Sequence, residues 1–189
     1  MIRLTETQKK TARLRKFSPT LGQAALLVGI DEVGTKEDPA NSNDGPRIRQ
    51  YQSTTEAFQI SWGASFITWC FFESGTDLGG VAWSSSSSES WFDTARANNQ
   101  NGTKVGPNNT TVKTIRQSQV IEGDIVLFDW DRESEGIFDR VGLVNIPPTR
   151  DGMFQSLEGN IDYDEQSNGG QVIQIMRNVL QVVAWVRVS

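Results

Sequence analysis

The chain of 189 residues contains no histidine and only one cysteine, Cys70. The absence of histidine removes the commonest transition-metal ligand and the side chain that ordinarily titrates near neutral pH. A single cysteine excludes an intrachain disulfide. Asp129, Asp131, Glu133 and Glu135 are spaced like ligands of a calcium loop, but Ser134 stands where an EF-hand requires glycine, so a solvated acidic hairpin is favoured. We therefore expect no metal and no cofactor.

Long apolar runs are also missing. No stretch approaches the roughly 20 apolar residues that cross a bilayer, and the first residues lack the apolar segment of a signal peptide. Hydrophobic residues make up 37% of the chain and charged residues 22%, which are ordinary values for a globular domain. We expect no membrane partner and no signal peptide, and a protein that folds in a reducing cell interior.

Positive charge is concentrated at the N-terminus. Within residues 1–16, six basic side chains face Glu6 alone, giving a local net charge of +5 against −5 for the whole chain, so the remainder carries −10. The arm, residues 1–17, is either a solvated terminus or a tether to an acidic protein surface. Nucleic acid is not expected, because the body is acidic and no aromatic residue precedes Phe17. The basic residues of the arm are Arg3, Lys9, Lys10, Arg13, Arg15 and Lys16.

Helical patterns occupy the first half of residues 18–189, which we interpret as one domain. Ser18-Pro19 predicts a helix start and Gly34 its stop. Pro46 opens a short helix to Tyr51, and Ser61 caps an apolar helix from Gly63 to about Ser74 that should be central and buried. The segment from Glu89 to Asn98 can form another helix, and residues 99–110 are predicted to be a surface loop.

The second half has the period of β-strands. Short β-rich runs separated by turn residues predict about six strands. Helices followed by strands indicate an α+β fold with helices packed on an antiparallel sheet. The predicted strands are Val112–Ile115, Asp124–Trp130, Arg140–Asn145, Met153–Leu157, Val172–Met176 and Val182–Val188.

Three motifs follow one another along this domain. Residues 61–70 read SWGASFITWC, residues 123–130 read GDIVLFDW with DRVGLV at 139–144, and residues 158–160 read EGN. In that order and spacing they resemble the W-C-A-x-F-x-x-W-C, G-D-I-V-x-F, D-H-V-G-I-V and E-G-N motifs of the CHAP and NlpC-type superfamily, papain-like peptidases and amidases that cut peptidoglycan. The resemblance covers roughly residues 19–188 and implies a papain-like fold.

The resemblance also shows which chemistry this chain lacks. Such a site uses a cysteine at a helix N-terminus, a histidine as base and a third polar group that orients the histidine. Gly63 stands at the cysteine position and Arg140, which cannot accept a proton, at the histidine position. Glu158 and Asn160 remain as candidates for the third group. We expect no catalysis, and Arg140 either pairs with Asp139 or Glu158 or is simply exposed.

Other residues of the expected site are less diagnostic. Cys70 lies two helical turns beyond Gly63 and is predicted to be a buried packing residue, while Ser65, the nearest hydroxyl, has no histidine to activate it. A surviving ligand groove would be lined by Trp62, Asn43, Trp83 and Trp91.

Three functional hypotheses follow. In the first, the domain is an inactive structural part of an assembly, such as a phage tail or baseplate, that contacts other subunits through the arm. It would then reside in the host cytoplasm during assembly and afterwards in the virion. In the second, it binds peptidoglycan without cutting it. In the third, a partner completes an active peptidase or amidase site.

Overall fold

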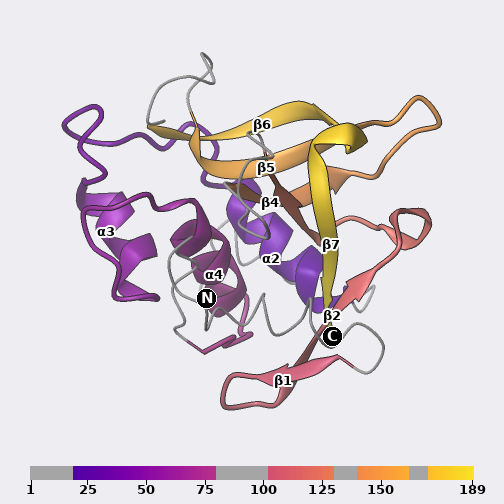
Figure 1. The fold of residues 1–189 in the computed structure, drawn as a ribbon. Coiled ribbons are helices and arrows are strands. Elements are labelled where there is room, and N and C mark those ends of the chain that lie inside the picture. Colours follow the sequence, from indigo (N-terminus) through magenta and orange to yellow (C-terminus); the bar gives the residue numbers. More distant parts are fainter. Residues whose placement is uncertain (1–18, 80–101, 130–139, 162–169) are drawn as a thin grey trace, which may run out of the picture.

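A computed structural model describes residues 19–79, 102–129, 140–161 and 170–189. In these ranges three α-helices precede seven strands, so the predicted α+β class is confirmed (Figure 1). The helices are α2 (Leu21–Ile30), α3 (Pro46–Ser53) and α4 (Gly63–Glu73). The strands are β1 (Thr103–Val105), β2 (Thr110–Ile115), β3 (Ile125–Phe128), β4 (Arg140–Ile146), β5 (Met153–Ile161), β6 (Gln171–Asn178) and β7 (Val182–Val188).

The seven strands form one antiparallel sheet in the order β1-β2-β7-β3-β4-β5-β6. The last strand of the chain therefore lies between β2 and β3 (Figure 1). At the centre, Ile125 and Leu127 of β3 contact the main core, whereas Val126 and Phe128 belong to a second cluster. Because successive side chains of a strand point to opposite faces, the uninterrupted apolar run of β3 is buried on both sides.

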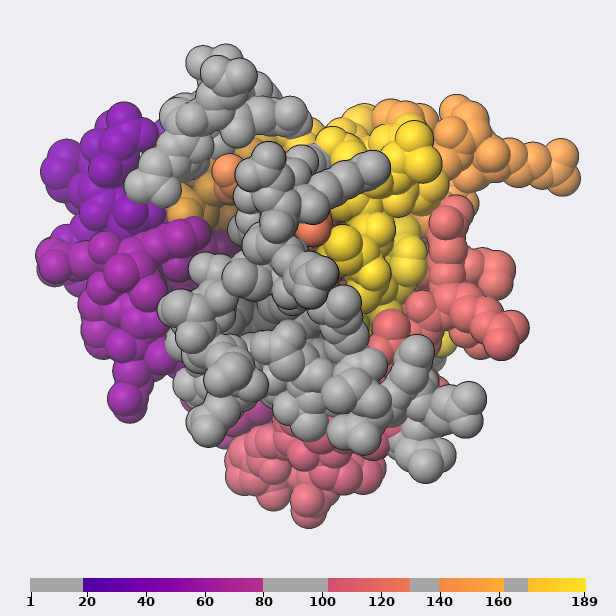
Figure 2. Space-filling model, in the orientation of Figure 1, coloured from indigo at the N-terminus to yellow at the C-terminus, as the bar shows by residue number. Residues whose placement is uncertain are grey.

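Helix α4 is the central helix, as its sequence predicts. It packs against α2 and α3 and lies over β4 and β5. Seven consecutive residues, Ser65 to Phe71, are buried, and Phe66, Ile67 and Phe71 have no exposed surface. Figure 2 shows α3 and the segments next to it on one side of the molecule and the yellow strands β6 and β7 on the other.

Two local predictions differ from the structure. The segment predicted as a loop at residues 99–110 contains β1, which pairs with β2 through a turn with Gly106 and Asn109 at positive φ. A three-residue strand is too short to produce a periodic pattern. The cap of α2 is Thr20, whose hydroxyl accepts the N–H of Gln23 at 3.2 Å while the Gln23 side chain accepts the N–H of Thr20 at 3.0 Å. The helix therefore begins with a capping box at Thr20.

Two glycines bring α2 and β3 into backbone contact. A Cβ on Gly22 would lie 2.2 Å from the carbonyl oxygen of Gly123, and a Cβ on Gly123 would lie 2.1 Å from the carbonyl carbon of Gly22. Gly123 also has φ of +84°, which side-chain-bearing residues rarely adopt. Position 123, at the start of the G-D-I-V motif, thus requires glycine for two reasons: its positive φ and its close contact with the backbone of Gly22.

Polar side chains brace the three helices. Glu32, just after α2, accepts hydrogen bonds from Arg47 (Nε, 2.8 Å) and from the hydroxyl of Tyr51 (2.6 Å), both on α3. The Arg47 guanidinium lies 4.6 Å from the ring centroid of Trp69 on α4. Burial by itself would raise the pKa of Glu32, but the bonds from Arg47 and Tyr51 outweigh it and hold the pKa below its ordinary value.

This brace makes stability depend on pH. A carboxyl whose pKa is lower in the folded state contributes stability that is full above its unfolded pKa and is lost as pH falls through the folded pKa. Asp44, whose pKa is lowered to about 2 by Arg49 and the N–H of Gly45, acts in the same direction. We expect the free energy of unfolding to fall steadily below about pH 4.5, and Glu32→Gln to flatten that fall. Urea unfolding at a series of pH values measures the free energy of unfolding, with Glu122→Gln, a change at an exposed carboxylate, as control. If the free energy of unfolding of Glu32→Gln falls with pH as steeply as that of the unaltered chain, the role assigned to Glu32 is contradicted.

Cys70 is the free thiol of the chain, and it has no exposed surface. Its burial confirms the predicted packing role. Burial raises the pKa of this thiol well above its usual value, and the nearby Glu32 carboxylate adds to the effect. Because the thiolate is the reactive form, a thiol reagent should label the native protein much more slowly than the urea-unfolded protein at pH 8. Equal rates would contradict the packing role.

No helix in the described ranges is both long enough and apolar enough to cross a membrane.

Candidate functional site

The three motif segments meet where the N-terminus of α4 faces the ends of β4 and β5 nearest to it. We call this place, formed by Ser61, Gly63, Arg140 and Asn160, the motif corner. The predicted cap Ser61 does not cap α4, which begins after Trp62 with no side-chain cap. Instead the hydroxyl of Ser61 accepts a hydrogen bond from the Asn160 amide at 2.8 Å. Asn160 in turn offers its backbone carbonyl to Arg140 Nη1 at 3.2 Å.

The backbone of β5 sets the direction of Asn160. The pairing of β5 with β6 shifts register between Glu158 and Ile161, and Asn160 has φ of +60°. Asparagine tolerates this left-handed conformation better than most residues. The irregularity turns the amide of Asn160 toward Ser61, so the side chain links the sheet to the start of α4. A β-bulge commonly redirects a side chain in this way.

Gly63 faces the backbone of β5 at close range. A Cβ built on Gly63 would lie 3.0 Å from the carbonyl oxygen of Gly159, a contact tighter than most Cβ atoms make. Gly159 itself fits under the rings of Trp62 and Phe66, with its own hypothetical Cβ within 2.9 Å of both side chains. The helix therefore starts almost in contact with the strand, and a side chain at position 63 requires a small backbone shift.

Glu158 does not belong to the motif corner. It neighbours Gly159, whose α-carbon faces α4, so the Glu158 side chain points to the opposite face of the sheet. There its two oxygens accept hydrogen bonds from Arg177 Nε and Nη2, each at 2.9 Å, and the hydroxyl of Ser156 donates to it. The expected pairing of Arg140 with Glu158 is therefore wrong, and the other expected partner, Asp139, lies outside the described residues.

The Glu158–Arg177 ion pair is almost fully buried. The side chains are 0% and 2% exposed, and the Arg177 guanidinium lies 5.5 Å from the ring centroid of Phe128. Sequence analysis did not single out Arg177. A signal was present, since the period-2 pattern of β6 places Arg177 on the same face as the apolar residues Ile173 and Ile175.

Trp62 is not a groove residue. Its ring has no exposed surface and packs against Tyr51 and Phe66, with centroids 5.6 Å and 6.4 Å away. Its indole N–H donates to Glu37 Oε1 at 2.8 Å. Glu37 is held in place because residues 34–37 run along β6, with the N–H of Glu37 bonded to the carbonyl of Gly170. The expected role of Trp62 in contacting a ligand is therefore replaced by a role in the core.

Asn43 is half-buried in the loop before α3. Its backbone carbonyl accepts a hydrogen bond from Gln52 Nε2 at 3.0 Å. Trp83, Trp91 and the basic arm lie outside the described residues. The same is true of the predicted helix from Glu89 to Asn98.

The motif corner does not hold a nucleophile paired with a base. Ser65, the nearest hydroxyl on α4, is buried and shares a hydrogen bond of 2.7 Å with Thr55. Among the described residues no group of histidine, cysteine or carboxylate side chains is placed to hold a metal ion. Among the described residues, one acceptor of the corner, Asn160 Oδ1, has no hydrogen-bond donor, although Asn160 is only 2% exposed.

No protein-family model and no curated protein sequence matches the chain. Among solved structures, the chain is similar to the wild type endolysin LysIME-EF1, with a TM-score of 0.33 and 20% sequence identity. The match covers 40% of this chain and 36% of the endolysin chain, about a third of that protein. A structural similarity this weak supports no conclusion about activity.

Proposed function

We propose that this chain is a non-hydrolytic relative of the papain-like cell-wall hydrolases and serves as a structural part of an assembly, such as a phage tail or baseplate. One observation supports the proposal above the others. The segments that hold a nucleophile, a base and an orienting group in the hydrolases meet here, but they carry glycine, arginine and asparagine. The hydrogen bonds of Asn160 to Ser61 and Arg140 join the segment before α4 to β5 and β4, and among these described groups none can act as a general base.

The absence of hydrolysis is directly testable. Purified protein incubated with cell walls should release no muropeptides above a buffer control, while an active wall hydrolase in the same assay should release them. Gly63→Cys should also be inactive, because the Arg140 guanidinium cannot take the thiol proton. Muropeptide release by the unaltered protein at a rate proportional to its concentration would contradict the proposal.

The double variant Gly63→Cys with Arg140→His tests the ancestry. A thiol at the start of α4 gains from the helix dipole, and an imidazole on β4 supplies the base, with Asn160 at hand to orient it. We expect measurable release from this variant only if the carbonyl of Gly159 yields enough space for the new side chain. Labelling of the new cysteine by a thiol reagent reports whether it is accessible.

The proposed assembly role predicts where the protein is found. The chain should be present at fixed stoichiometry in purified phage particles, and removal of residues 1–17 should lower its incorporation, since six cations can follow an acidic track on a neighbouring subunit. Each exposed ion pair is worth only about 0–1 kcal/mol, so incorporation should also fall as salt is raised. Full incorporation without the arm would contradict its role as a tether.

A second candidate function, binding of peptidoglycan without cleavage, is favoured by the corner acceptor Asn160 Oδ1, which has no donor among the described residues. Buried acceptors cost free energy unless a donor reaches them, and amide N–H groups of a wall peptide could supply it. The test is co-sedimentation with purified sacculi. Asn160→Gly keeps the left-handed backbone and removes the amide, so it should release the protein from sacculi. Asn109→Gly, which makes the same change at an exposed turn with φ of +53°, is the matched control.

A further inference from the structure

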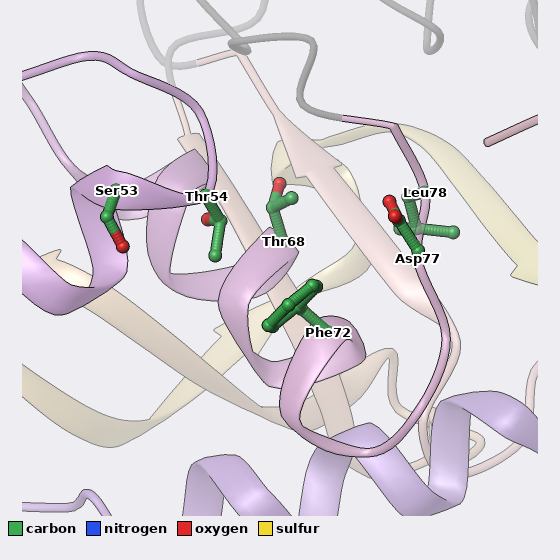
Figure 3. Close-up of a pocket in the computed structure, with 6 residues that line it drawn as sticks. All are labelled: Ser53, Thr54, Thr68, Phe72, Asp77 and Leu78. Atoms are coloured by element: carbon green, nitrogen blue, oxygen red, sulfur yellow. The ribbon is translucent and has the colours of Figure 1, made fainter. Parts of the chain in front are cut away.

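A pocket of about 260 Å³ opens between the end of α3, the later turns of α4 and residues 76–78 (Figure 3). It is separate from the motif corner, because Thr68 and Phe72 lie five and nine residues beyond Gly63 on α4, about 7–14 Å along the helix axis. The lining residues are Ser53, Thr54, Thr68, Phe72, Asp77 and Leu78.

The hydroxyl groups of the pocket have already used their protons. Ser53 Oγ donates to the carbonyl of Gln50 at 2.7 Å, Thr54 Oγ1 to that of Tyr51 at 2.8 Å and Thr68 Oγ1 to that of Ala64 at 2.9 Å. A hydroxyl has one proton and two lone pairs. The described hydroxyls therefore have no proton to donate to a ligand, and those of Ser53 and Thr54 can accept from one.

Asp77 adds a negative charge. One carboxylate oxygen, Oδ1, accepts the N–H of Gly79 at 2.7 Å, which fixes the side chain on the 76–78 segment. Among the described residues, the other carboxylate oxygen of Asp77, Oδ2, has no hydrogen-bond partner. In the part of the chain that the structure describes, the lining contains no lysine or arginine that would neutralise this charge.

Apolar surface completes the pocket. Phe72 is 53% exposed, and in Figure 3 its ring lies one turn of α4 below Thr68. Leu78 is 2% exposed and belongs to the core beneath. An aromatic face beside a carboxylate attracts an organic cation through both its charge and the ring quadrupole.

We propose that this pocket binds an alkylammonium or guanidinium group on an apolar stem, the chemistry of a lysine or arginine side chain. Such a group brings the donors and the positive charge that the pocket lacks, and its stem can lie against Phe72 and Leu78. An anion would meet the Asp77 charge and, among the described lining residues, no side-chain donor. The cation can come from a free small amine or from a basic segment, of which residues 1–17 with six basic side chains are one.

The test is a titration of the full chain, labelled with nitrogen-15, with N-acetyl-lysine methylamide. We expect saturable shifts of the amides of α4 and residues 76–79, with affinity in the millimolar range typical of a small ligand. The Nε-acetylated form of the same compound is the neutral match. It should bind roughly tenfold more weakly or not at all, because the charge-assisted bond is lost. Equal binding of the two compounds, or no saturable shift with either, would overturn the proposal.

Variants locate the site. Asp77→Asn retains an oxygen for the Gly79 N–H but removes the charge, and it should weaken binding of the cation by roughly tenfold. Phe72→Leu keeps the apolar contact and removes the ring, so it should weaken binding by a smaller factor. Glu122→Gln removes an exposed charge elsewhere and should leave the affinity unchanged. Equal affinity in Asp77→Asn and the unaltered chain would show that the cation binds elsewhere.

A synthetic peptide of residues 1–17 distinguishes the sources. Tighter binding of the peptide than of the small amine, with the same dependence on Asp77, identifies a basic segment as the occupant. Binding of the peptide that ignores Asp77, beside an Asp77-dependent small amine, identifies a free amine as the occupant.

Discussion

Arg177→Met should lower the free energy of unfolding by about 3–5 kcal/mol, because it leaves the Glu158 carboxylate buried without its partner. Both hydrogen bonds from Arg177 to that carboxylate disappear, and among the described residues Ser156 is then the one remaining donor. Urea unfolding followed by tryptophan fluorescence gives the change from the midpoint at constant slope. A loss below about 1 kcal/mol would mean that water or another donor reaches Glu158.

The double variant Glu158→Leu with Arg177→Met separates two explanations. If the loss comes from an unpaired buried charge, apolar residues of similar size at both positions should restore most of the stability. If the pair is needed to hold β5 and β6 in register, the double variant stays unstable. Arg49→Met, which breaks the ion pair of the exposed Arg49 with Asp44, is the matched control and should change stability much less.

Gly123→Ala should destabilise the fold by about 2–5 kcal/mol. The left-handed conformation costs an alanine roughly 1–2 kcal/mol, and overpacking against the backbone of Gly22 adds about 1–3 kcal/mol. Since the atoms in the way are backbone atoms, relief requires α2 to move away from β3. The same urea experiment measures the change.

Gly34→Ala is the control for this prediction. Gly34 has φ of +91°, but a Cβ there would meet nothing within 4 Å. It should therefore show the conformational cost alone. Equal losses for the two variants would contradict the claim that the contact between Gly22 and Gly123 matters.

The periodic parts of the fold could be predicted from the sequence, and the irregular parts could not. The apolar pattern around Phe66 and the continuous apolar run of β3 each depend on a few neighbouring residues, so pattern and structure agree. Strand β1 has three residues and depends on pairing with β2, which no local pattern contains. The capping box of Thr20 and Gln23 does have a local signal, but Ser18-Pro19 two residues earlier offers a similar one.

The candidate site could likewise be predicted from the sequence only in part. Motif order was sufficient to predict that Gly63, Arg140 and Asn160 would meet, because the resemblance included their place in the fold. The alternation along β5 could have shown that Glu158 and Gly159 face opposite sides. The partner of Glu158 could not be foreseen, because Arg177 lies 19 residues away and is joined to Glu158 only through the pairing of β5 with β6.

The position of β7 has a consequence for synthesis on the ribosome. Strands β2 and β3 can both be complete while the residues that must lie between them are still untranslated. Until Val182–Val188 emerges, each of the two strands has an open edge with unpaired N–H and C=O groups, and such edges can pair with other chains. Closure of the central sheet therefore has to wait for β7, and until then correct folding depends on keeping nascent chains apart.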